Sequence, residues 1–206
     1  MDKNNYIIGY LDEEEQWRLT ARNGLKAYFK IVVLDLPQAP AMVWPAIVDN
    51  KLDALIVDFR LFESGEVTYN GNDVINEVQK HNKHFPLFVM TSYENDAFSQ
   101  CEDVLIIRDK SLFQKDEDLL RFKQTLKSRL DSYYRKKEEC RQRLLELNKQ
   151  DVLTQPQKEE KFKAELYLSE LDLDNAPALN LLPSGYTETM ETILRLAEDI
   201  SSSLKR

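Results

Sequence analysis

The sequence predicts an α/β fold: a five-stranded doubly wound parallel sheet followed by an α-helical extension. Five short apolar runs recur in the first half of the 206-residue chain, and stretches with helical spacing separate them. Each run is apolar at successive positions rather than at alternate ones, as expected for strands buried on both faces of a parallel sheet. Beyond residue 115 no further β-branched run of this kind occurs, and charged stretches with helical spacing follow.

The apolar runs locate the strands, and right-handed helical crossovers are expected between them. The predicted strands cover residues 6–11, 31–34, 54–57, 87–90 and 104–107. The predicted helices cover residues 14–29, residues 41–50, a segment capped by Asn72 or Asp73, and a short segment near 95–101. Pro45 should shorten the helix at 41–50. Residues 59–71 are expected to form a loop because they contain two glycine turn signals.

The second half is predicted to begin with one long helix over residues 116–149, whose start packs on the sheet. A 4-3 apolar spacing continues along it, which is typical of a coiled-coil dimer or an antiparallel helix pair. The positions of this seam are Leu126, Leu130, Tyr133, Lys137, Cys140, Leu144 and Leu147. Pro156 is expected to break the chain before helices over 157–171 and 186–204, joined by a loop at 172–185. These helices should fold back on the long one, so we divide the chain into a sheet domain (1–127) and a helical extension (128–206).

Composition limits the cellular setting that the sequence predicts. The chain carries a formal net charge of −8 and no run of 18 apolar residues, so no membrane contact is expected. No apolar segment follows a basic start, so no secretory signal is expected. Cys101 and Cys140 are too few for a disulfide framework. These features favour a cytoplasmic location.

The charge distribution bears on the partners of the helical half. Residues 121–149 contain 10 basic and 4 acidic side chains, whereas residues 150–206 contain 6 basic and 11 acidic ones. A basic helix could contact phosphates, but a basic helix beside an acidic segment is more typical of pairing within a chain or a dimer. We therefore expect no nucleic-acid partner, and we expect a homodimerisation or protein-interaction role for this half.

Polar residues follow the predicted strands at the points where those strands end. Asp12 and Glu13 follow the first strand, Asp58 the third, Thr91 the fourth, and Lys110 lies just beyond the fifth. Ligands of parallel sheets bind at this carboxyl edge. Three carboxylates in one cleft repel one another unless a cation lies between them. Mg²⁺ prefers oxygen ligands, so we expect it to bind there with Asp12, Glu13 and Asp58 as its ligands. With Lys110 and Thr91 added, the set suits phosphoryl transfer to a carboxylate, and Asp58 is the best nucleophile because its strand is central.

At these residues the sequence resembles the receiver domain of two-component response regulators, over about residues 5–127. The matching pieces are Ile8-Gly9-Tyr10-Leu11-Asp12-Glu13-Glu14, Ala54-Leu55-Ile56-Val57-Asp58, Gly71-Asn72-Asp73-Val74-Ile75 through Pro86-Leu87-Phe88-Val89-Met90-Thr91-Ser92, and Lys110. The resemblance implies a flavodoxin-like strand order 2-1-3-4-5. It also implies that Asp58 accepts a phosphoryl group from a histidine kinase or phosphotransfer protein. Thr91 and Lys110 would contact that group, and a downstream protein would respond. Beyond self-phosphorylation and self-dephosphorylation, no enzymatic activity is implied.

Four features differ from the pattern of that family. Glu13 stands where a second aspartate is usual, Ser111 where a proline is usual, and Ile107 where an aromatic residue is usual. The stretch 58–71 is also longer than usual. These differences support an alternative interpretation, a degenerate pseudo-receiver that acts as a phosphorylation-independent binding or scaffold module. A phosphatase of the haloacid dehalogenase type would need a second acid where this chain has Arg60.

Several further side chains receive an ordinary structural interpretation. His81 and His84 lie at a polar helix end and are expected to be solvated. Trp17 and Trp44 are expected to pack in the core or between helices. Arg108 lies near Lys110 and is the alternative cation for the predicted site.

Overall fold

The computed structural model describes residues 6–92 and 107–174 of the chain. Five parallel strands form one sheet in the order β2-β1-β3-β4-β5. The strands are β1 (Ile7–Leu11), β2 (Lys30–Val33), β3 (Ala54–Asp58), β4 (Leu87–Thr91) and β5 (Ile107–Asp109). The predicted fold class, including its flavodoxin-like strand order, is therefore confirmed.

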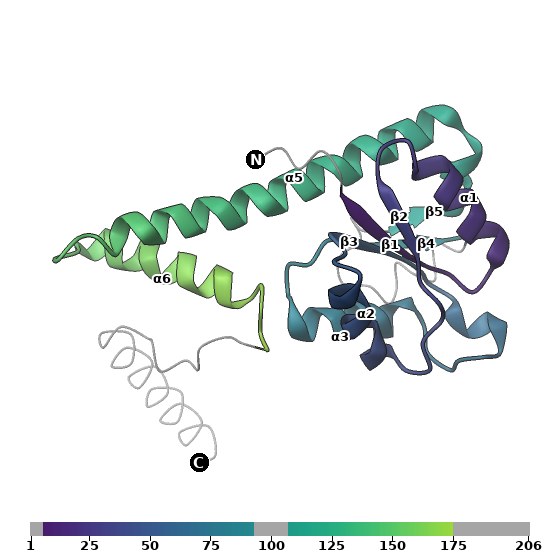
Figure 1. Ribbon diagram of the computed structural model, residues 1–206, viewed down its shortest axis with the longest axis horizontal. Helices are drawn as coiled ribbons and strands as arrows, with labels where there is room; N and C mark the ends of the chain where they lie inside the picture. Colours follow the sequence, from purple (N-terminus) through teal and green to yellow (C-terminus); the bar gives the residue numbers. More distant parts are fainter. Residues whose placement is uncertain (1–5, 93–106, 175–206) are drawn as a thin grey trace, which may run out of the picture.

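Helices cover both faces of this sheet (Figure 1). They are α1 (Glu15–Leu25), α2 (Val43–Asp49), α3 (Gly71–His81) and the start of α5 (Asp116–Leu147). A further helix, α6 (Gln155–Ser169), packs on α5 instead of on the sheet. Short 3₁₀ helices cover Pro40–Met42, Leu61–Ser64 and Lys110–Gln114. The helices predicted near 95–101 and over 186–204, most of the loop predicted at 172–185, residues 104–106 of the predicted fifth strand, and Cys101 lie outside the described residues.

Two apolar cores sandwich the sheet, which explains why its strands are apolar at successive positions. On one face, α1 and α5 pack on strand residues such as Tyr10, Ile56 and Phe88. On the other face, α2 and α3 pack on the alternate strand residues, such as Leu55 and Val57. Because successive strand residues point to opposite faces, a strand covered on both faces has no polar side.

Element boundaries differ from the predicted ones where turn chemistry decides them. Asn70 caps α3, rather than Asn72 or Asp73, because its side chain accepts a hydrogen bond from the Asp73 N–H while the Asp73 side chain accepts one from the Asn70 N–H. Gly71 follows the cap, and a Cβ at that position would collide with the Asp58 carbonyl oxygen. Pro156 does not break the chain but lies in the first turn of α6, where its missing N–H costs nothing.

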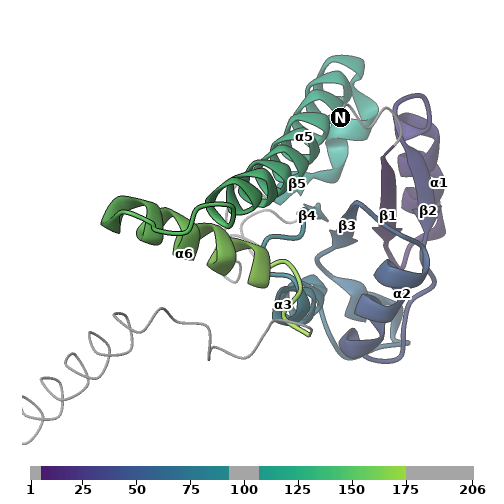
Figure 2. The same cartoon turned by 60° about the vertical axis from the view of Figure 1, so that its left-hand side comes forward.

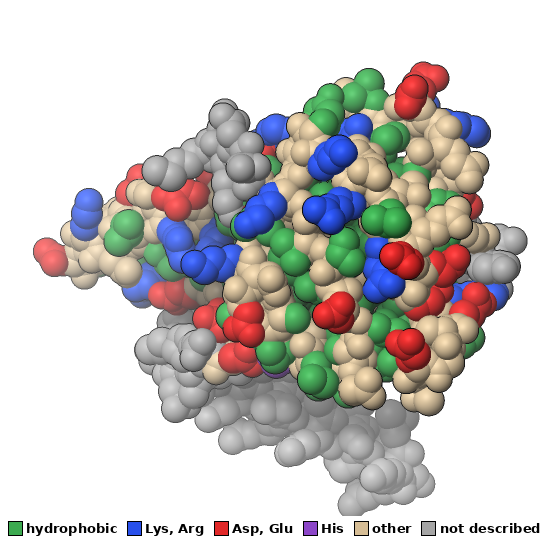
Figure 3. Space-filling model, turned by 45° about the vertical axis from the view of Figure 1, so that its right-hand side comes forward, with side chains coloured by type: hydrophobic (Ala, Val, Ile, Leu, Met, Phe, Trp, Pro, Cys, Tyr) green, Lys and Arg blue, Asp and Glu red, His purple; other side chains and the backbone are tan. Residues whose placement is uncertain are grey.

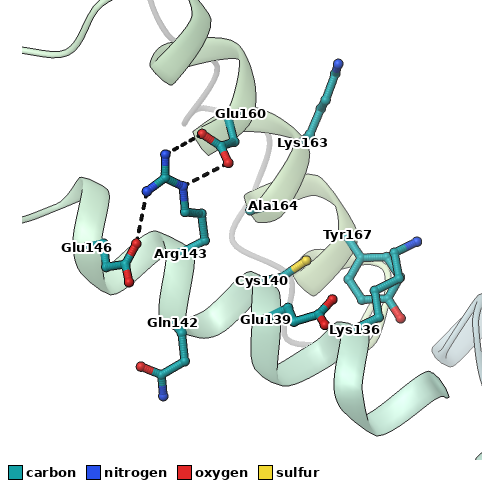
Figure 4. A pocket seen from close by; sticks show the side chains of 10 residues that line it. All are labelled: Lys136, Glu139, Cys140, Gln142, Arg143, Glu146, Glu160, Lys163, Ala164 and Tyr167. Atoms are coloured by element: carbon teal, nitrogen blue, oxygen red, sulfur yellow. Dashed lines mark hydrogen bonds and ion pairs between the residues drawn. The ribbon is translucent and has the colours of Figure 1, made fainter. Parts of the chain in front are cut away.

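The long helix is confirmed, and α6 returns along it within the same chain (Figures 1 and 2). At a rise of 1.5 Å per residue, the 32 residues of α5 extend for about 50 Å, beyond the edge of the sheet. Every position of the predicted seam is buried or half-buried. At its far end, Cys140 lies opposite Ala164 and Tyr167 of α6 (Figure 4). This end of the seam therefore pairs within one chain.

Charged side chains reinforce the helix pair. Arg143 forms a fork with both carboxylate oxygens of Glu160, at 2.8 and 2.7 Å, and reaches Glu146 at 2.9 Å (Figure 4). Three other basic side chains of α5 have acidic neighbours on the same helix. These pairs are Arg121–Glu117, Lys127–Asp131 and Arg135–Glu139. In Figure 3 several Lys and Arg side chains lie in the upper middle of the face, whereas Asp and Glu side chains are spread over its lower half and its left end, with hydrophobic side chains among them. None of the helices in the described part of the chain could cross a membrane.

Hydrogen bonds at the amino-terminal edge of the sheet fix the direction of α5. The buried Asp53 carboxylate accepts hydrogen bonds from the Tyr134 hydroxyl of α5 and, at 2.8 Å, from the Ile7 N–H of β1. Two further bonds run from the Tyr6 hydroxyl to Asp131 at 2.6 Å and from the Asn82 amide to the Tyr133 hydroxyl at 3.0 Å. The middle of α5 is thereby held to two strand starts and to the end of α3.

Removing the Tyr134 hydroxyl should test this attachment. We expect Tyr134→Phe to lower the free energy of unfolding by about 1–2 kcal/mol, because the buried Asp53 carboxylate loses a donor. The control is Tyr28→Phe, whose ring is exposed and which should change stability by less than about 0.5 kcal/mol. Urea denaturation measures both. Equal effects of the two substitutions would contradict the proposed attachment.

Candidate functional site

Two adjacent strands bring the predicted carboxylates together at the carboxyl edge of the sheet. Leu11 of β1 pairs with Val57 of β3, so Asp12 and Asp58 follow at neighbouring positions. Glu13 comes next in the chain, and one carboxylate oxygen from each of these three acids lies within 4.8 Å of the others. Asp12 and Asp58 are buried, and Glu13 is half-buried. Burial at a shared edge brings three acidic groups into one small volume.

Lys110 is the cation of this cluster. It follows β5 directly, and its side chain is only 3% exposed. Its Nζ atom lies 2.6 Å from Asp58 Oδ1 and 3.0 Å from Asp12 Oδ2. The alternative cation, Arg108, donates a hydrogen bond to the Ile107 carbonyl oxygen instead. Lys110 therefore bridges the acids that end β1 and β3.

Burial and mutual repulsion shift the acidities in the cluster. Burial, reinforced by the charge of Asp58, raises the pKa of Glu13 to about 8. Burial also raises the pKa of Asp58, although Lys110 opposes this shift. For Lys110 burial lowers the pKa, but the charges of Asp58 and Asp12 outweigh it and raise the pKa. One lysine does not balance three acids, and the cluster is short of positive charge.

The donor set fits a hard divalent cation. All three acids offer carboxylate oxygens, which are the ligands that Mg²⁺ prefers. Glu13 Oε2 is buried and, among the described residues, has no hydrogen-bond partner. A buried acceptor of this kind is costly unless a donor or a cation satisfies it. Asp12, Glu13 and Asp58 are thus the residues that could hold such an ion.

Thr91 lies at the same edge. It is the last residue of β4, the strand beside β3, and it is buried. The Phe59 N–H, just past Asp58, donates a hydrogen bond to the carbonyl oxygen of Met90 at 3.0 Å. All five residues predicted from the sequence therefore lie at one edge of the sheet.

Four neighbours of the cluster were not predicted as site residues. The Tyr10 hydroxyl and the Glu14 N–H each donate a hydrogen bond to Asp12 at 3.0 Å. The Arg60 N–H donates one to Asp58 Oδ2. The Trp17 ring, expected only to pack, has Lys110 Nζ at 5.4 Å from its centre. Tyr10 and Trp17 could have been found from the sequence by their spacing. Tyr10 lies two residues before Asp12, on the same face of the strand, and Trp17 lies one helical turn after Glu13. The backbone N–H donors could not, because every residue except proline has one.

Two of the positions that differ from the receiver pattern take other structural roles. The Asp109 side chain accepts a hydrogen bond from the Ser111 N–H at 2.6 Å, which starts the 3₁₀ helix after Lys110. Ile107 is buried in the core on the α2 and α3 side of the sheet. Neither side chain contributes a polar group to the cluster.

No protein-family model matches this chain, and no curated protein matches it. Among solved structures, a fusion protein containing a trimeric coiled-coil segment of yeast Spc42 is similar over 79% of this chain and 92% of its own, with 14% identity and a TM-score of 0.49. The RcsB response regulator of Salmonella typhimurium, described with conformational dynamism for DNA interaction, is similar over 81% of this chain and 93% of its own, with 17% identity and a TM-score of 0.45. Both similarities are weak, and the fold assignment rests on the strand order.

The raised pKa of Glu13 predicts how stability depends on pH. The folded protein keeps a proton on Glu13 up to about pH 8, whereas an unfolded glutamate loses it near its ordinary value of 4.5. The folded state binds more protons over this range, so stability falls as the pH rises from about 4.5 to 8. Glu13→Gln removes the titration, and in chelator at pH 8 it should be more stable than wild type by about 2 kcal/mol, allowing for partial exposure.

Thermal or urea unfolding at pH 5 and pH 8 measures this difference. Near pH 5 the two proteins should be almost equally stable, because Glu13 is then neutral in the folded state. The matched control is Glu66→Gln, which changes an exposed glutamate outside the cluster. A variant no more stable than wild type at pH 8 would show that Glu13 is not destabilised in its ionised form.

Proposed function

We propose that this chain is a receiver-like signalling protein in which Asp58 accepts a phosphoryl group from a histidine kinase or phosphotransfer protein. Asp12, Glu13 and Asp58 are proposed to hold Mg²⁺. The observation that carries this proposal is the contact of 2.6 Å between Asp58 Oδ1 and Lys110 Nζ, within a cluster of three acids at the carboxyl edge of a parallel sheet. Its geometry agrees with the resemblance of these residues to receiver domains.

Each side chain has a distinct part in the proposed transfer. The Asp58 carboxylate is the nucleophile, and it needs little activation because the reaction depends mainly on position and charge neutralisation. The Arg60 N–H holds Oδ2, which fixes the orientation of the carboxylate. Lys110 supplies a fixed positive charge beside Oδ1. When bound, Mg²⁺ supplies further positive charge to the phosphoryl oxygens. We assign to the Thr91 hydroxyl a hydrogen bond to one of those oxygens.

The helical half is proposed to transmit the state of the site to a downstream protein. Lys110 begins the 3₁₀ helix that leads within a few residues into α5. Phosphorylation would add about 1.5–2 negative charges at Asp58, and Lys110 is the cation that would respond first. Because Leu126 and Leu130 of the seam are buried against the sheet, the exposed sides of the α5–α6 pair are the proposed surface for a homodimer or another protein partner.

A second candidate function is a pseudo-receiver that binds partners without phosphorylation. The specific observation in its favour is Ile107, which is buried in the core where receivers have a mobile aromatic side chain. In this interpretation the fold presents a constant surface, and the acidic cluster does not bind Mg²⁺ productively. The two candidates predict different responses to a phosphoryl donor and to Mg²⁺.

Incubation with acetyl phosphate and Mg²⁺ tests the phosphoacceptor directly. We expect intact-protein mass spectrometry to detect an adduct with the mass of one phosphoryl group, because Asp58 is positioned for attack and Lys110 offsets the developing charge. Asp58→Asn should remove the adduct. Asp49→Asn, at an exposed aspartate, should retain it. An adduct that survives Asp58→Asn, or none in wild type, would refute the mechanism.

Thermal unfolding with and without Mg²⁺ tests the metal site independently of phosphorylation. A ligand that binds only the folded state raises the unfolding midpoint, so millimolar Mg²⁺ should raise the midpoint of wild type by a few degrees. Asp12→Asn should abolish this shift because it removes one carboxylate of the cluster. Asp35→Asn, an exposed aspartate elsewhere, should retain it. Equal midpoints with and without Mg²⁺ in wild type would favour the pseudo-receiver.

A further inference from the structure

The end of α6 is attached to the corner between α3 and β4. The Lys83 N–H donates a hydrogen bond to the Glu170 carbonyl oxygen at 2.9 Å, and the Leu173 N–H donates one to the His81 carbonyl oxygen at 2.8 Å. Figure 2 shows the yellow-green segment after α6 beside α3. This corner precedes β4 and so lies at the amino-terminal edge of the sheet, opposite the acidic cluster.

Two histidines of the corner face carboxylates of the α6 end. His81 Nδ1 lies 2.7 and 2.8 Å from the two carboxylate oxygens of Asp174. His84 Nε2 lies 2.7 Å from Glu170 Oε2, and Lys83 Nζ lies 2.7 Å from Glu170 Oε1. The expectation that both histidines are solvated is therefore wrong. Two of these three contacts are ion pairs only when the histidine is protonated, and otherwise they are hydrogen bonds from a neutral ring.

Other groups around the His81 ring fix its position. The ring stacks on Trp44 of α2 with a centre-to-centre distance of 5.1 Å and an interplanar angle of 1°. Its Nε2 atom lies 3.7 Å from a carboxylate oxygen of Glu77, one turn earlier in α3. Lys80 in turn pairs with Glu77 at 2.6 Å. Protonated His81 therefore lies between two carboxylates, Asp174 and Glu77.

The His84 ring is held by α6 and, through its backbone, by α5. It packs on Tyr167 at 4.7 Å between ring centres, and Lys136 Nζ lies 4.0 Å from the centre of the same tyrosine ring. The His84 N–H donates a hydrogen bond to the side chain of Asn82, which also bonds Tyr133. Protonation of His84 would therefore act mainly through Glu170.

The rest of the helix pair stays attached when this contact opens. The fork from Arg143 to Glu160 holds the first half of α6 on α5 (Figure 4), and α5 is held to the sheet through Asp53. Within the described residues, opening is thus confined to the last turn of α6 and residues 170–174. Such a local opening does not require the sheet or the helix pair to unfold.

We propose that the contact between residues 81–84 and residues 170–174 is a reversible, pH-controlled clasp. Protonated His81 and His84 strengthen the attachment of the α6 end to the corner, and loss of these protons weakens it. This proposal goes beyond the proposed function and does not depend on phosphorylation of Asp58.

The chemistry of histidine sets the range and the size of the effect. Histidine is the side chain that ordinarily changes charge between about pH 5 and 8. A hydrogen bond between charged partners is about twice as strong as one between neutral partners. An exposed ion pair, however, contributes little to the free energy of holding two segments together. Two such pairs should change the opening equilibrium by about tenfold. Lysine and glutamate side chains ordinarily both carry charge between about pH 5 and 8, so the contact between Lys83 and Glu170 should remain and the clasp should weaken rather than vanish.

Hydrogen exchange of two amides reports the clasp directly. The amides of Lys83 and Leu173 donate the two backbone hydrogen bonds across it, and their protection factors in the full chain can be measured by NMR. We expect both protection factors to fall about tenfold between about pH 5.5 and 8, after correction for the intrinsic pH dependence of exchange. The amide of Leu55, bonded to the Pro86 carbonyl within the sheet, is the internal reference and should not follow them.

Variants separate the histidines from other titrating groups. In the double variant His81→Gln, His84→Gln, the two protection factors should no longer depend on pH. Glu13 titrates in the same range but is unchanged in this variant, so any pH dependence that it causes would persist. Lys161→Gln, which alters an ion pair of α6 away from the corner, should behave as wild type.

Two results would overturn the clasp: protection that is independent of pH in wild type, or the same tenfold fall in the double variant. Far-UV circular dichroism and protection of the Leu55 amide establish that each variant is folded. If the double variant does not fold, Asp174→Asn takes its place, because it removes the partner of His81 at a largely exposed position. It should lower the protection of Leu173 at pH 5.5 and reduce its pH dependence, and unchanged protection would contradict the proposal.

Discussion

Charge balance around the Lys110 ammonium group is the constraint on which the carboxyl edge depends. Three acids from two strands occupy a volume that is largely closed to water, and Lys110 contacts two of them at 2.6 and 3.0 Å. Buried ions are costly unless they are paired and hydrogen-bonded, which explains the donors that surround Asp12 and Asp58. Glu13 is left as the excess acid, and its pKa rises to about 8 because burial and Asp58 disfavour its charge. The same excess makes the edge suited to a cation.

A second set of polar contacts balances the opposite edge of the sheet, and it serves attachment rather than chemistry. There the buried Asp53 carboxylate receives hydrogen bonds from Tyr134 and from the β1 backbone. Neutral donors satisfy a carboxylate without attracting a phosphoryl group or a cation. The two buried aspartates lie at opposite ends of β3 and have different surroundings: Asp53 directly precedes the strand, and Asp58 is its last residue. The strand order and the side-chain partners, rather than the residue type, determine that Asp58 and not Asp53 lies beside Asp12 and Lys110.

The sequence predicted the sheet and the cluster well because both follow from patterns along the chain. Apolar runs mark strands covered on both faces, and acids at strand ends must share one edge, so Asp12 and Asp58 were found without coordinates. What failed depended on contacts between distant residues. His81 and His84 looked solvated because their partners, Glu170 and Asp174, lie almost a hundred residues later in the chain. The cap of α3 was misplaced because Asn70, Asn72 and Asp73 are all good caps, and only the reciprocal bonds of Asn70 distinguish them.

The pairing of α6 with α5 shows why the apolar seam did not by itself predict an oligomer. A seam of this spacing can be covered by another chain or by the same chain. Here the turn between α5 and α6 spans only the residues from Asn148 to Thr154, so the local concentration of α6 near the seam is far above that of a second molecule. The Arg143–Glu160 fork and the Tyr167 ring then favour this register over a sliding one. The seam nearer the sheet is also closed, because Leu126 and Leu130 are buried in the sheet core, so a partner chain must displace α6 or bind another side of the helix pair. Displacement would begin most easily at the end of α6, where the contacts with the corner depend on histidine charge.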